Sequence, residues 1–460
     1  MNDAIKLERG GALRRFKPYP AYKDSGVEWL GKIPANWTAK RLKLVAAAPI
    51  KNGIGEAGAY DNPEWPRYVR ITDIAGPREL REDTFKSLPP ELAREAPFKT
   101  GDLLLAAVGA TFGKSYLHIR DFGSACYAGY MVRFSPGHQV EASFAAYWTE
   151  SSAYWALVQS RVVQATIQNF SAAKYKELVL PLPSLKEQRA ISAYLDRETA
   201  RIDALVAKKG RLIDLLQEQR TALITRAVTK GLDPNVPMKD SGVEWLGEIP
   251  AHWEVKPLKA LAGLQTGLTL GKKYEDQRLT TRPYLRVANV QDGYLNLDDI
   301  AELELPAQDV ARYELRQGDV LMTEGGDFDK LGRGHVWGGQ IAGCLHQNHI
   351  FAVRPRRGLL HPRYLALSMS SGYGRAYFTA TSKQSTNLAS TNSTKLRNFP
   401  MPVPKPEEQS GITTWIDQET ARIDELIAKV REAIDRLKEL RTALISTAVT
   451  GKIDVRAEVA

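Results

Sequence analysis

The segment DSGVEWLGKIPANW at residues 24–37 occurs again, nearly unchanged, as DSGVEWLGEIPAHW at residues 240–253. Twelve of the fourteen positions agree at an offset of 216 residues, which chance does not produce. Further along, EQRAISAYLDRETARID at 187–203 matches EQSGITTWIDQETARID at 408–424, at an offset of 221. Self-similarity of this kind indicates that one structural unit occurs twice in the chain. We therefore predict a tandem repeat in which each half is a globular domain followed by a helical segment.

The composition is that of a soluble globular protein. The chain has 460 residues, of which 43% are hydrophobic and 25% charged, and no apolar run is long enough to cross a membrane. The N-terminal residues lack the apolar stretch of a secretion signal, and Cys126 and Cys344 are the only cysteines. These features predict a cytoplasmic location and exclude a disulfide scaffold. The net charge of +10 is compatible with a polyanionic partner, although so modest an excess does not establish one.

The two globular domains are expected at residues 24–183 and 240–404, after an N-terminal extension at 1–23. Both contain short apolar runs between glycine and proline turns, such as residues 67–71 and 102–108, which are typical of strands. Residues 142–160 have the pattern of a helix that packs on them. We predict the α+β class, with each domain ending in a stiff proline-rich linker.

The segments at 184–231 and 405–452 are predicted to be long helices. Apolar residues alternate at spacings of three and four, as along the seam of a coiled coil, with Lys209 and Gln219 as polar interruptions. A helix of about 40 residues is ~60 Å long and needs a partner for its apolar stripe. We expect the two copies to pair as antiparallel coiled-coil helices related by a pseudo-twofold axis. The predicted seam residues are Ile202, Leu205, Leu212, Leu216, Leu223, Ile423, Leu426, Val430, Leu437, Leu440 and Leu444.

No catalytic constellation is visible in the sequence. The string Asn62-Pro63-Glu64-Trp65 departs at its third position from the tetrapeptide of amino-methyltransferases. The string GATFGKS at residues 109–115 resembles a phosphate-binding loop, but it has three residues between its glycines where that loop has four. We interpret it as a strand–turn–strand. Cys344, His346 and His349, with His335 upstream, could ligate zinc, but a closed site needs four well-placed ligands. We therefore predict neither catalytic residues nor a metal site.

The repeated segments resemble the specificity subunit of type I restriction–modification systems. The resemblance rests on YKDSGVEWLGKIPANW at 22–37 and its second copy, the P-x-P-x-x-x-E-Q entry into each helix, and the RTALI-x-x-AVT segments at 220–229 and 441–450. It covers nearly the whole chain in the family's own order. It implies two target-recognition domains, each binding one half of a bipartite, asymmetric DNA target. The coiled coil is then expected to set the spacer between the halves.

The resemblance also implies partners and cofactors. Two modification subunits dock on the helices and methylate adenine at N6, and restriction subunits add an endonuclease. S-adenosylmethionine, ATP and Mg²⁺ belong to those partners, so this chain is expected to hold no cofactor and to be no enzyme. It is expected in the cytoplasm of a bacterium or archaeon. The alternatives are a stand-alone DNA methyltransferase or nuclease with an unrecognised active site, and a protein-binding scaffold that ignores DNA.

Residues that could contact DNA are polar or basic and lie in glycine-rich loops beside strands, where side chains can reach phosphates or base edges. Each could equally be a solvated loop residue, and Arg70 and Arg286, which the repeat makes equivalent, could belong to the scaffold. The predicted contacts are Lys51, Asn52, Arg70, Thr72, Asp73, Thr111, Lys114, Gln168, Asn169, Thr266, Lys272, Lys273, Arg286, Asn289, Asp327, Lys330, Arg333, Gln347, Asn348, Lys383 and Gln384.

Other repeated residues are expected to be structural. Trp29, Trp37, Trp245 and Trp253 stand in nearly identical contexts in the two halves, which favours packing against the helix ends over stacking on bases. The repeated Arg-Ile-Asp at 201–203 and 422–424 is expected to brace the coiled coil or to face partner subunits.

Overall fold

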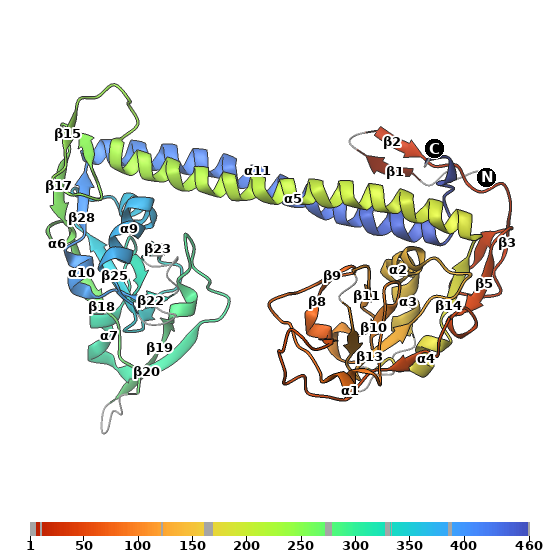
Figure 1. Cartoon of the computed structure of the whole chain (residues 1–460). Helices are drawn as coiled ribbons and strands as arrows, with labels where there is room; N and C mark the ends of the chain where they lie inside the picture. Colours follow the sequence, from red (N-terminus) through yellow and green to blue (C-terminus); the bar gives the residue numbers. More distant parts are fainter. Residues whose placement is uncertain are drawn as a thin grey trace. The chain divides into compact units, whose positions relative to one another are not determined.

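The computed structural model describes residues 6–9, 12–120, 123–160, 169–271, 278–326, 332, 334–384 and 389–458. Its contacts divide the chain into two compact units (Figure 1). The first unit comprises residues 1–209 and 431–460, and the second comprises residues 210–430. Both divisions fall inside a long helix, so each long helix contributes one end to each unit.

The two long helices are α5 (Leu185–Lys230) and α11 (Pro406–Val449). In the first unit, Nε of Arg441 on α11 lies 3.1 Å from the Asp203 carboxylate on α5. In the second unit, Nε of Arg220 on α5 lies 3.4 Å from the Asp424 carboxylate on α11. Early residues of one helix thus face late residues of the other, as in an antiparallel pair. Both aspartates come from the repeated Arg-Ile-Asp and both arginines from RTALI, so these segments brace the helix pair twice.

The predicted seam is wrong at Leu205, Leu212 and Leu426, while its other residues, including Leu440, are buried or half-buried. Ile202, Ile423 and Leu444 are buried, but Leu205, Leu212 and Leu426 are 41%, 43% and 50% exposed. The covered residues on α5 are Ile202, Val206, Lys209, Ile213, Leu216, Arg220 and Leu223, and those on α11 include Ile423, Ile427, Val430, Ile434, Leu437, Arg441 and Leu444. The step of four therefore comes before the step of three. Because apolar residues stand side by side at 205–206, 212–213 and 426–427, the sequence fits both registers, and the packing against the opposite helix selects one.

The first unit is built on small sheets. Its four-stranded sheet has the order β11-β10-β13-β6, while β7 and β12 pair in parallel and β5 pairs with β14. Its strands are β1 (Lys6–Arg9), β2 (Ala12–Arg15), β3 (Tyr22–Asp24), β4 (Lys32–Pro34), β5 (Thr38–Arg41), β6 (Lys51–Asn52), β7 (Arg67–Val69), β8 (Ile74–Gly76), β9 (Glu79–Leu80), β10 (Leu103–Ala106), β11 (Ser115–Leu117), β12 (Ala125–Tyr127), β13 (Met131–Phe134) and β14 (Val179–Leu182). Its shorter helices are α1 (Pro90–Ala93), α2 (Ala142–Glu150), α3 (Ser152–Ser160) and α4 (Ala172–Lys176), with the 3₁₀ turns η1 (Leu42–Leu44), η2 (Ile71–Asp73), η3 (Gly109–Thr111) and η6 (Arg456–Glu458).

The second unit repeats much of this plan. Its four-stranded sheet has the order β18-β25-β21-β23, β19 pairs in parallel with β24, and β17 with β28 takes the place of β5 with β14. Its strands are β15 (Met238–Asp240), β16 (Glu248–Pro250), β17 (Glu254–Pro257), β18 (Ala262–Thr266), β19 (Leu279–Leu285), β20 (Ala301–Pro306), β21 (Val320–Thr323), β22 (Gly325–Gly326), β23 (Gly334–Val336), β24 (Leu345–His346), β25 (Ile350–Pro355), β26 (Lys383–Gln384), β27 (Ala389–Ser390) and β28 (Pro400–Val403). Its shorter helices are α6 (Leu258–Leu261), α7 (Ala307–Tyr313), α8 (Pro362–Ser370), α9 (Gly372–Thr381) and α10 (Ser393–Arg397), with the 3₁₀ turn η4 (Val287–Asn289).

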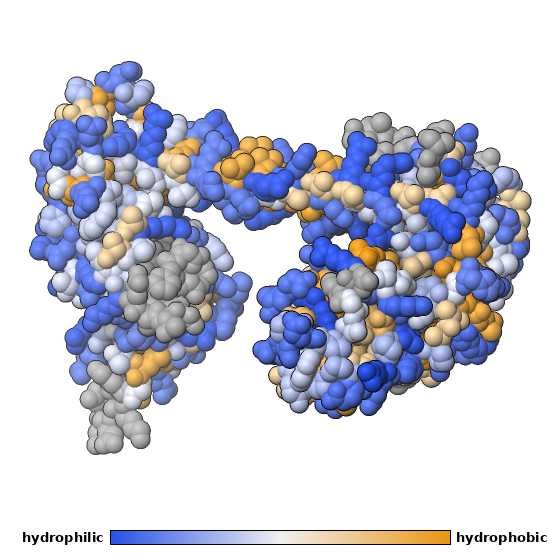
Figure 2. Space-filling model, viewed as in Figure 1, coloured by the Kyte–Doolittle hydropathy of each residue, from blue (hydrophilic) through white to orange (hydrophobic). Residues whose placement is uncertain are grey.

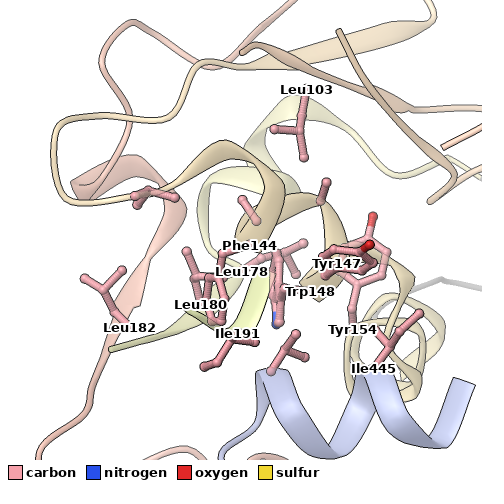
Figure 3. Close-up of a cluster of buried hydrophobic side chains, with 14 of the residues drawn as sticks. Leu103, Phe144, Tyr147, Trp148, Tyr154, Leu178, Leu180, Leu182, Ile191 and Ile445 are labelled. Carbon is pink, nitrogen blue, oxygen red and sulfur yellow. The ribbon is translucent and has the colours of Figure 1, made fainter. Parts of the chain in front are cut away.

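In each unit the hydrophobic core joins the globular domain to the long helices. In the first unit, Trp148 of α2, Ile191 of α5 and Ile445 of α11 belong to one buried cluster (Figure 3). In the second unit, Ile224 of α5 and Ile412 of α11 are buried with Tyr364 and Phe399 of the domain. Each domain is therefore fixed to one end of the helix pair by shared apolar burial, which is the main stabilising term in packing.

The P-x-P-x-x-x-E-Q segment joins each domain to the start of a long helix. In the first unit, the indole N–H of Trp37 donates to Glu187 Oε1 at 3.0 Å, and Gln188 Nε2 donates to the carbonyl of Pro183 at 2.9 Å. In the second unit, the equivalent bonds join Trp253 to Glu408 at 3.0 Å and Gln409 to Pro404 at 2.9 Å. Trp37 and Trp253 are both fully buried. Packing at a helix end is thus confirmed for these two tryptophans, whereas Trp245 is 48% exposed.

Candidate nucleic-acid interface

The same backbone junction occurs in both units. In the first unit, Ile54 N donates to Tyr127 O at 2.9 Å and Ala128 N donates to Val69 O at 3.0 Å. In the second unit, Leu268 N donates to His346 O at 2.8 Å, and Gln347 N donates to Leu285 O at 2.9 Å. We call these segments the junction; it comprises residues 52–55, 69–70 and 127–131 in the first unit and residues 266–269, 285–286 and 346–350 in the second.

A glycine in each unit permits the close approach of the backbones at the junction. A Cβ on Gly53 would lie 2.0 Å from Tyr127 O, and one on Gly267 would lie 2.2 Å from His346 O. Neither distance is compatible with a side chain, so both positions require glycine. The junction is therefore a fixed part of the scaffold in both units.

The turn at the junction carries different side chains in the two units. It reads Ala128-Gly129-Tyr130 in the first unit and Gln347-Asn348-His349 in the second. The backbone around it is equivalent, because Ala107 N donates to Tyr130 O at 2.9 Å and Glu324 N donates to His349 O at 2.9 Å. A constant backbone with variable side chains is the arrangement by which one scaffold can contact two different ligand sequences.

Several predicted contact residues meet at or beside this turn. Asn52 Nδ2 donates to Gly129 O at 2.9 Å, and Asn169 pairs with Val108 next to Ala107. Lys51, on the same strand as Asn52, is exposed and donates to the carbonyl of Glu95. In the second unit, Thr266, Gln347 and Asn348 belong to the junction itself. The structure thus brings together residues that are up to 118 positions apart in the first unit, from Lys51 to Asn169.

Arg70 and Arg286 belong to the scaffold beside the junction. Arg70 Nη2 lies 2.7 Å from Asp73 Oδ1, and this hydrogen bond raises the pKa of the Arg70 guanidinium above its ordinary value. The side chain of Asn289 accepts a hydrogen bond from Arg286 N at 2.7 Å and donates to two backbone carbonyls. Asp73 and Asn289 are 1% and 3% exposed. Asp73 and Asn289 therefore belong to the scaffold of the domain, because their polar groups form hydrogen bonds inside it, and their contact with DNA stays a prediction.

The string GATFGKS forms a turn between strands. Strand β10 runs into η3 and back along β11, with Ala106 N donating to the carbonyl of Lys114 at 2.8 Å. This confirms the strand–turn–strand interpretation. Lys114 is exposed and Thr111 half-buried on the turn, while Thr72 is exposed in η2. Lys383 is exposed on β26.

Six predicted residues lie outside the described residues: Gln168, Lys272, Lys273, Asp327, Lys330 and Arg333. The side chain of Gln384 is likewise not described. Tyr130 and His349 were missing from the prediction although both are exposed at the third position of the turn. Only the alignment of hydrogen bonds between the two units makes these residues equivalent, since their types differ.

The histidine and cysteine residues near this turn do not form a metal site in the described part of the chain. There, no group of three or more His, Cys, Asp or Glu side chains is arranged to hold an ion. Burial raises the pKa of Cys344 to about 12 and lowers that of His346 to about 4. His349 instead lies 2.7 Å from the Glu324 carboxylate.

None of the described helices has the length and apolar character needed to cross a bilayer.

Comparison with known proteins agrees with this architecture. Residues 34–212 match the family model of the type I restriction modification DNA specificity domain. The type I restriction enzyme EcoKI specificity subunit of Escherichia coli (strain K12) is 24% identical over 448 residues, covering 92% of this chain and 90% of that protein. The StySPI specificity subunit of Salmonella potsdam is 24% identical over 440 residues, with the same coverage of both chains.

Two solved structures share the fold. One chain, from a study of complex assembly and conformational transition of the type I R-M system, superposes with a TM-score of 0.65 at 18% identity, covering 91% of this chain and 98% of that one. The HsdS subunit from Thermoanaerobacter tengcongensis gives a TM-score of 0.51 at 18% identity, covering 92% and 98%. The chain, with its mixed helix and strand content, is thus similar over about nine tenths of its length to specificity subunits of type I restriction–modification systems, which are the non-catalytic members of those enzyme complexes.

Proposed function

We propose that this chain reads a bipartite, asymmetric DNA target, with one half of the target bound by each globular domain. The observation that carries the proposal is the junction, in which the same backbone presents Ala128-Gly129-Tyr130 in one unit and Gln347-Asn348-His349 in the other. Glutamine and asparagine can pair with the edge of adenine through two hydrogen bonds, which alanine and glycine side chains cannot. The two domains are therefore expected to read different half-sites.

We further propose that the paired helices set the spacer between the half-sites and dock two modification subunits, to which restriction subunits are added. The modification subunits supply S-adenosylmethionine-dependent methylation of adenine N6 after the base is turned out of the duplex. ATP and Mg²⁺ act in the restriction subunits. A complex with this role works in the cytoplasm, beside the chromosome.

The primary test is sequencing of methylated adenines in a strain with and without this gene. A split motif with two unlike halves that disappears with the gene is the expected result. Loss of no motif, or loss of a continuous one, contradicts the proposal. The purified chain with S-adenosylmethionine alone is expected to incorporate no methyl group.

A sharper test exchanges only the turn. The triple variant Gln347→Ala, Asn348→Gly, His349→Tyr gives the second unit the side chains of the first while leaving the junction glycine Gly267 in place. We expect it to change or relax one half-site in the methylated motif and to leave the other half-site and the spacer intact. Methylation of the unaltered motif at the wild-type rate would show that the turn does not read DNA.

Affinity for non-specific duplexes is expected to fall steeply with salt, because release of condensed counterions drives such binding. Exposed Lys51 and Lys114 are the matched pair to test in the first unit. Each change to alanine should reduce the slope of log K against log salt by about 1 if that lysine neutralises a phosphate. Gel shifts between 50 and 200 mM salt measure this slope, and an unchanged slope would show that the lysine does not contact a phosphate.

If the chain binds no duplex, with or without modification subunits, it would instead be a protein-binding scaffold that does not bind DNA.

A further inference from the structure

The start of each long helix carries an equivalent aromatic residue with a different environment in the two units. Tyr194 on α5 corresponds to Trp415 on α11 at the repeat offset of 221. Tyr194 is 1% exposed, whereas Trp415 is 37% exposed. The repeat therefore supplies an internal comparison of the same surface, covered in one unit and open in the other.

In the first unit the chain's own ends cover Tyr194. Phe16 packs edge-on against it, with ring centroids 6.3 Å apart. Residues after α11 lie beside the segment that contains Phe16, since Lys17 and Asp454 form an antiparallel bridge. Ile453 and Val455 of that C-terminal segment are 1% and 0% exposed. Two stretches of chain are thus present next to Tyr194.

In the second unit a single stretch takes the place of those two. Leu232 corresponds to Phe16 at an offset of 216 and to Ile453 at an offset of 221, and it is 41% exposed. Leu232, Pro234 and Trp415, together with Leu223 and Ala227 of α5, line an open groove of about 460 Å³. The groove lies where the first unit has its additional segment.

The charge of the groove indicates what can fill it. Among the described residues that line it, Arg226 alone is charged, and its exposed side chain forms no hydrogen bond or ion pair with another described residue. The residue at this position in the first unit is the uncharged Thr447. The segment around Phe16 is basic, with Arg14, Arg15 and Lys17, so a second copy of it would place positive charge beside Arg226.

We propose that this groove in the second unit docks a segment of one modification subunit, which inserts an aromatic side chain between Leu232 and Trp415 and places a carboxylate next to Arg226. This inference rests on the proposed function. It predicts that the two modification subunits bind with unequal affinities, because the equivalent surface of the first unit is already covered by Phe16. Aromatic and arginine side chains in such pockets contribute much of the binding free energy at protein interfaces.

The experiment titrates the full chain with purified modification subunit and measures both dissociation constants by calorimetry, with stoichiometry from native mass spectrometry. Trp415→Ala and Arg226→Glu are each expected to weaken the tighter binding event by about tenfold or more and to leave the other unchanged. Trp415→Tyr and Arg226→Lys should retain most of the affinity. Leu359→Ala, a change to a 48% exposed leucine of the same unit that does not line the groove, is the control and should change neither constant.

The proposed groove is wrong if neither dissociation constant changes in Trp415→Ala and Arg226→Glu. It is also wrong if each variant weakens both binding events equally. The proposal is equally overturned if the wild-type chain alone self-associates through the groove and Trp415→Ala abolishes that association. Thermal unfolding of each variant separates weakened docking from loss of fold. A wild-type chain that binds no modification subunit at all would contradict the proposed function itself, which distinguishes the two failures.

Discussion

Glu187 and Glu408 show how a single side chain can join a domain to a helix. Each carboxylate accepts the indole N–H of a buried tryptophan, and Glu187 also accepts Asn36 Nδ2 at 3.1 Å. The side chain of Glu187 is 4% exposed, whereas that of Glu408 is 32% exposed. If the carboxylate is removed, water can therefore accept the tryptophan N–H more readily at position 408 than at position 187.

We predict that Glu187→Ala destabilises the protein by about 2 kcal/mol, because it leaves the indole N–H of fully buried Trp37 without an acceptor in a dry site. Glu408→Ala should cost less, since its site is partly solvated. Urea unfolding of the two variants measures the difference. Equal losses, or a larger loss for Glu408→Ala, would show that burial does not set the cost.

His346 makes the stability of the second unit depend on pH. Burial lowers the pKa of His346 to about 4, and its Nδ1–H donates to the carbonyl of Ile350 at 2.9 Å. The unfolded chain binds a proton near pH 6.5, but the folded protein does so only near pH 4. The stabilising contribution is therefore complete above about pH 6.5 and is lost as the pH falls toward 4.

Wild-type protein is accordingly expected to lose about 2–3 kcal/mol relative to His346→Gln between pH 7.5 and pH 4.5. The glutamine variant is the reference because it cannot titrate but can still hydrogen-bond. Urea unfolding at the two pH values gives the double difference. A value near zero would mean that His346 becomes protonated within the folded protein.

At the scale of elements, the register of the long helices determines which leucines and isoleucines stabilise the pair. Ile427 is 6% exposed, while its neighbour Leu426 is 50% exposed. Figure 2 shows that apolar residues reach the surface of these helices. The two residues have the same number of side-chain carbons, so comparing them isolates burial from chemistry.

We predict that Ile427→Ala costs about 2–4 kcal/mol, the usual cost of truncating a buried aliphatic side chain. Leu426→Ala should change the free energy of unfolding by no more than about 0.5 kcal/mol. Chemical denaturation of both variants tests the register directly. A larger loss for Leu426→Ala than for Ile427→Ala would instead support the register that the sequence pattern alone predicted.

Position 451, just after the end of α11, requires glycine for two reasons. Gly451 has a φ of +72°, and a Cβ there would lie 2.3 Å from Pro34 Cδ. Gly31 has a φ of +61°, and a Cβ there would meet nothing within 4 Å beyond its chain neighbours. Gly31→Ala therefore isolates the conformational cost of about 1–2 kcal/mol, and Gly451→Ala adds steric overlap to it. We expect a clearly lower thermal midpoint for Gly451→Ala, and equal midpoints would contradict the close contact.

At the scale of the whole molecule, the helices are proposed to measure the DNA spacer. Insertion of seven residues into both α5 and α11 preserves a seam that repeats every seven residues. It lengthens each helix by ~10 Å, which corresponds to about three base pairs of duplex. We predict a methylated motif with the same half-sites and a longer spacer, read by sequencing of methylated adenines.

The control for this change inserts four residues into α5 alone. That insertion shifts half of the seam away from the opposite helix and should abolish assembly. An unchanged spacer after the matched seven-residue insertion would contradict the proposed measuring role of the helices.

The sequence predicted those features that local pattern determines. The repeat of DSGVEWLG established two equivalent halves, and the three–four spacing established two long helices. The nearly identical surroundings of Trp37 and Trp253 indicated packing, and GATFGKS was recognised as a turn because its spacing does not fit a phosphate loop. The seam was wrong at Leu205, Leu212 and Leu426 because adjacent apolar residues fit two registers equally well.

What the sequence by itself determined is the repeat and the class of each segment, because these depend on residue order and periodicity along the chain. Only the tertiary structure decided which face of each helix is buried, that Asp73 and Asn289 serve the scaffold, and that Tyr130 and His349 occupy the same place. It also decided that Tyr194 is covered while Trp415 is open. These properties depend on which distant segments approach one another, and burial and hydrogen bonding are set by that approach rather than by neighbours in sequence.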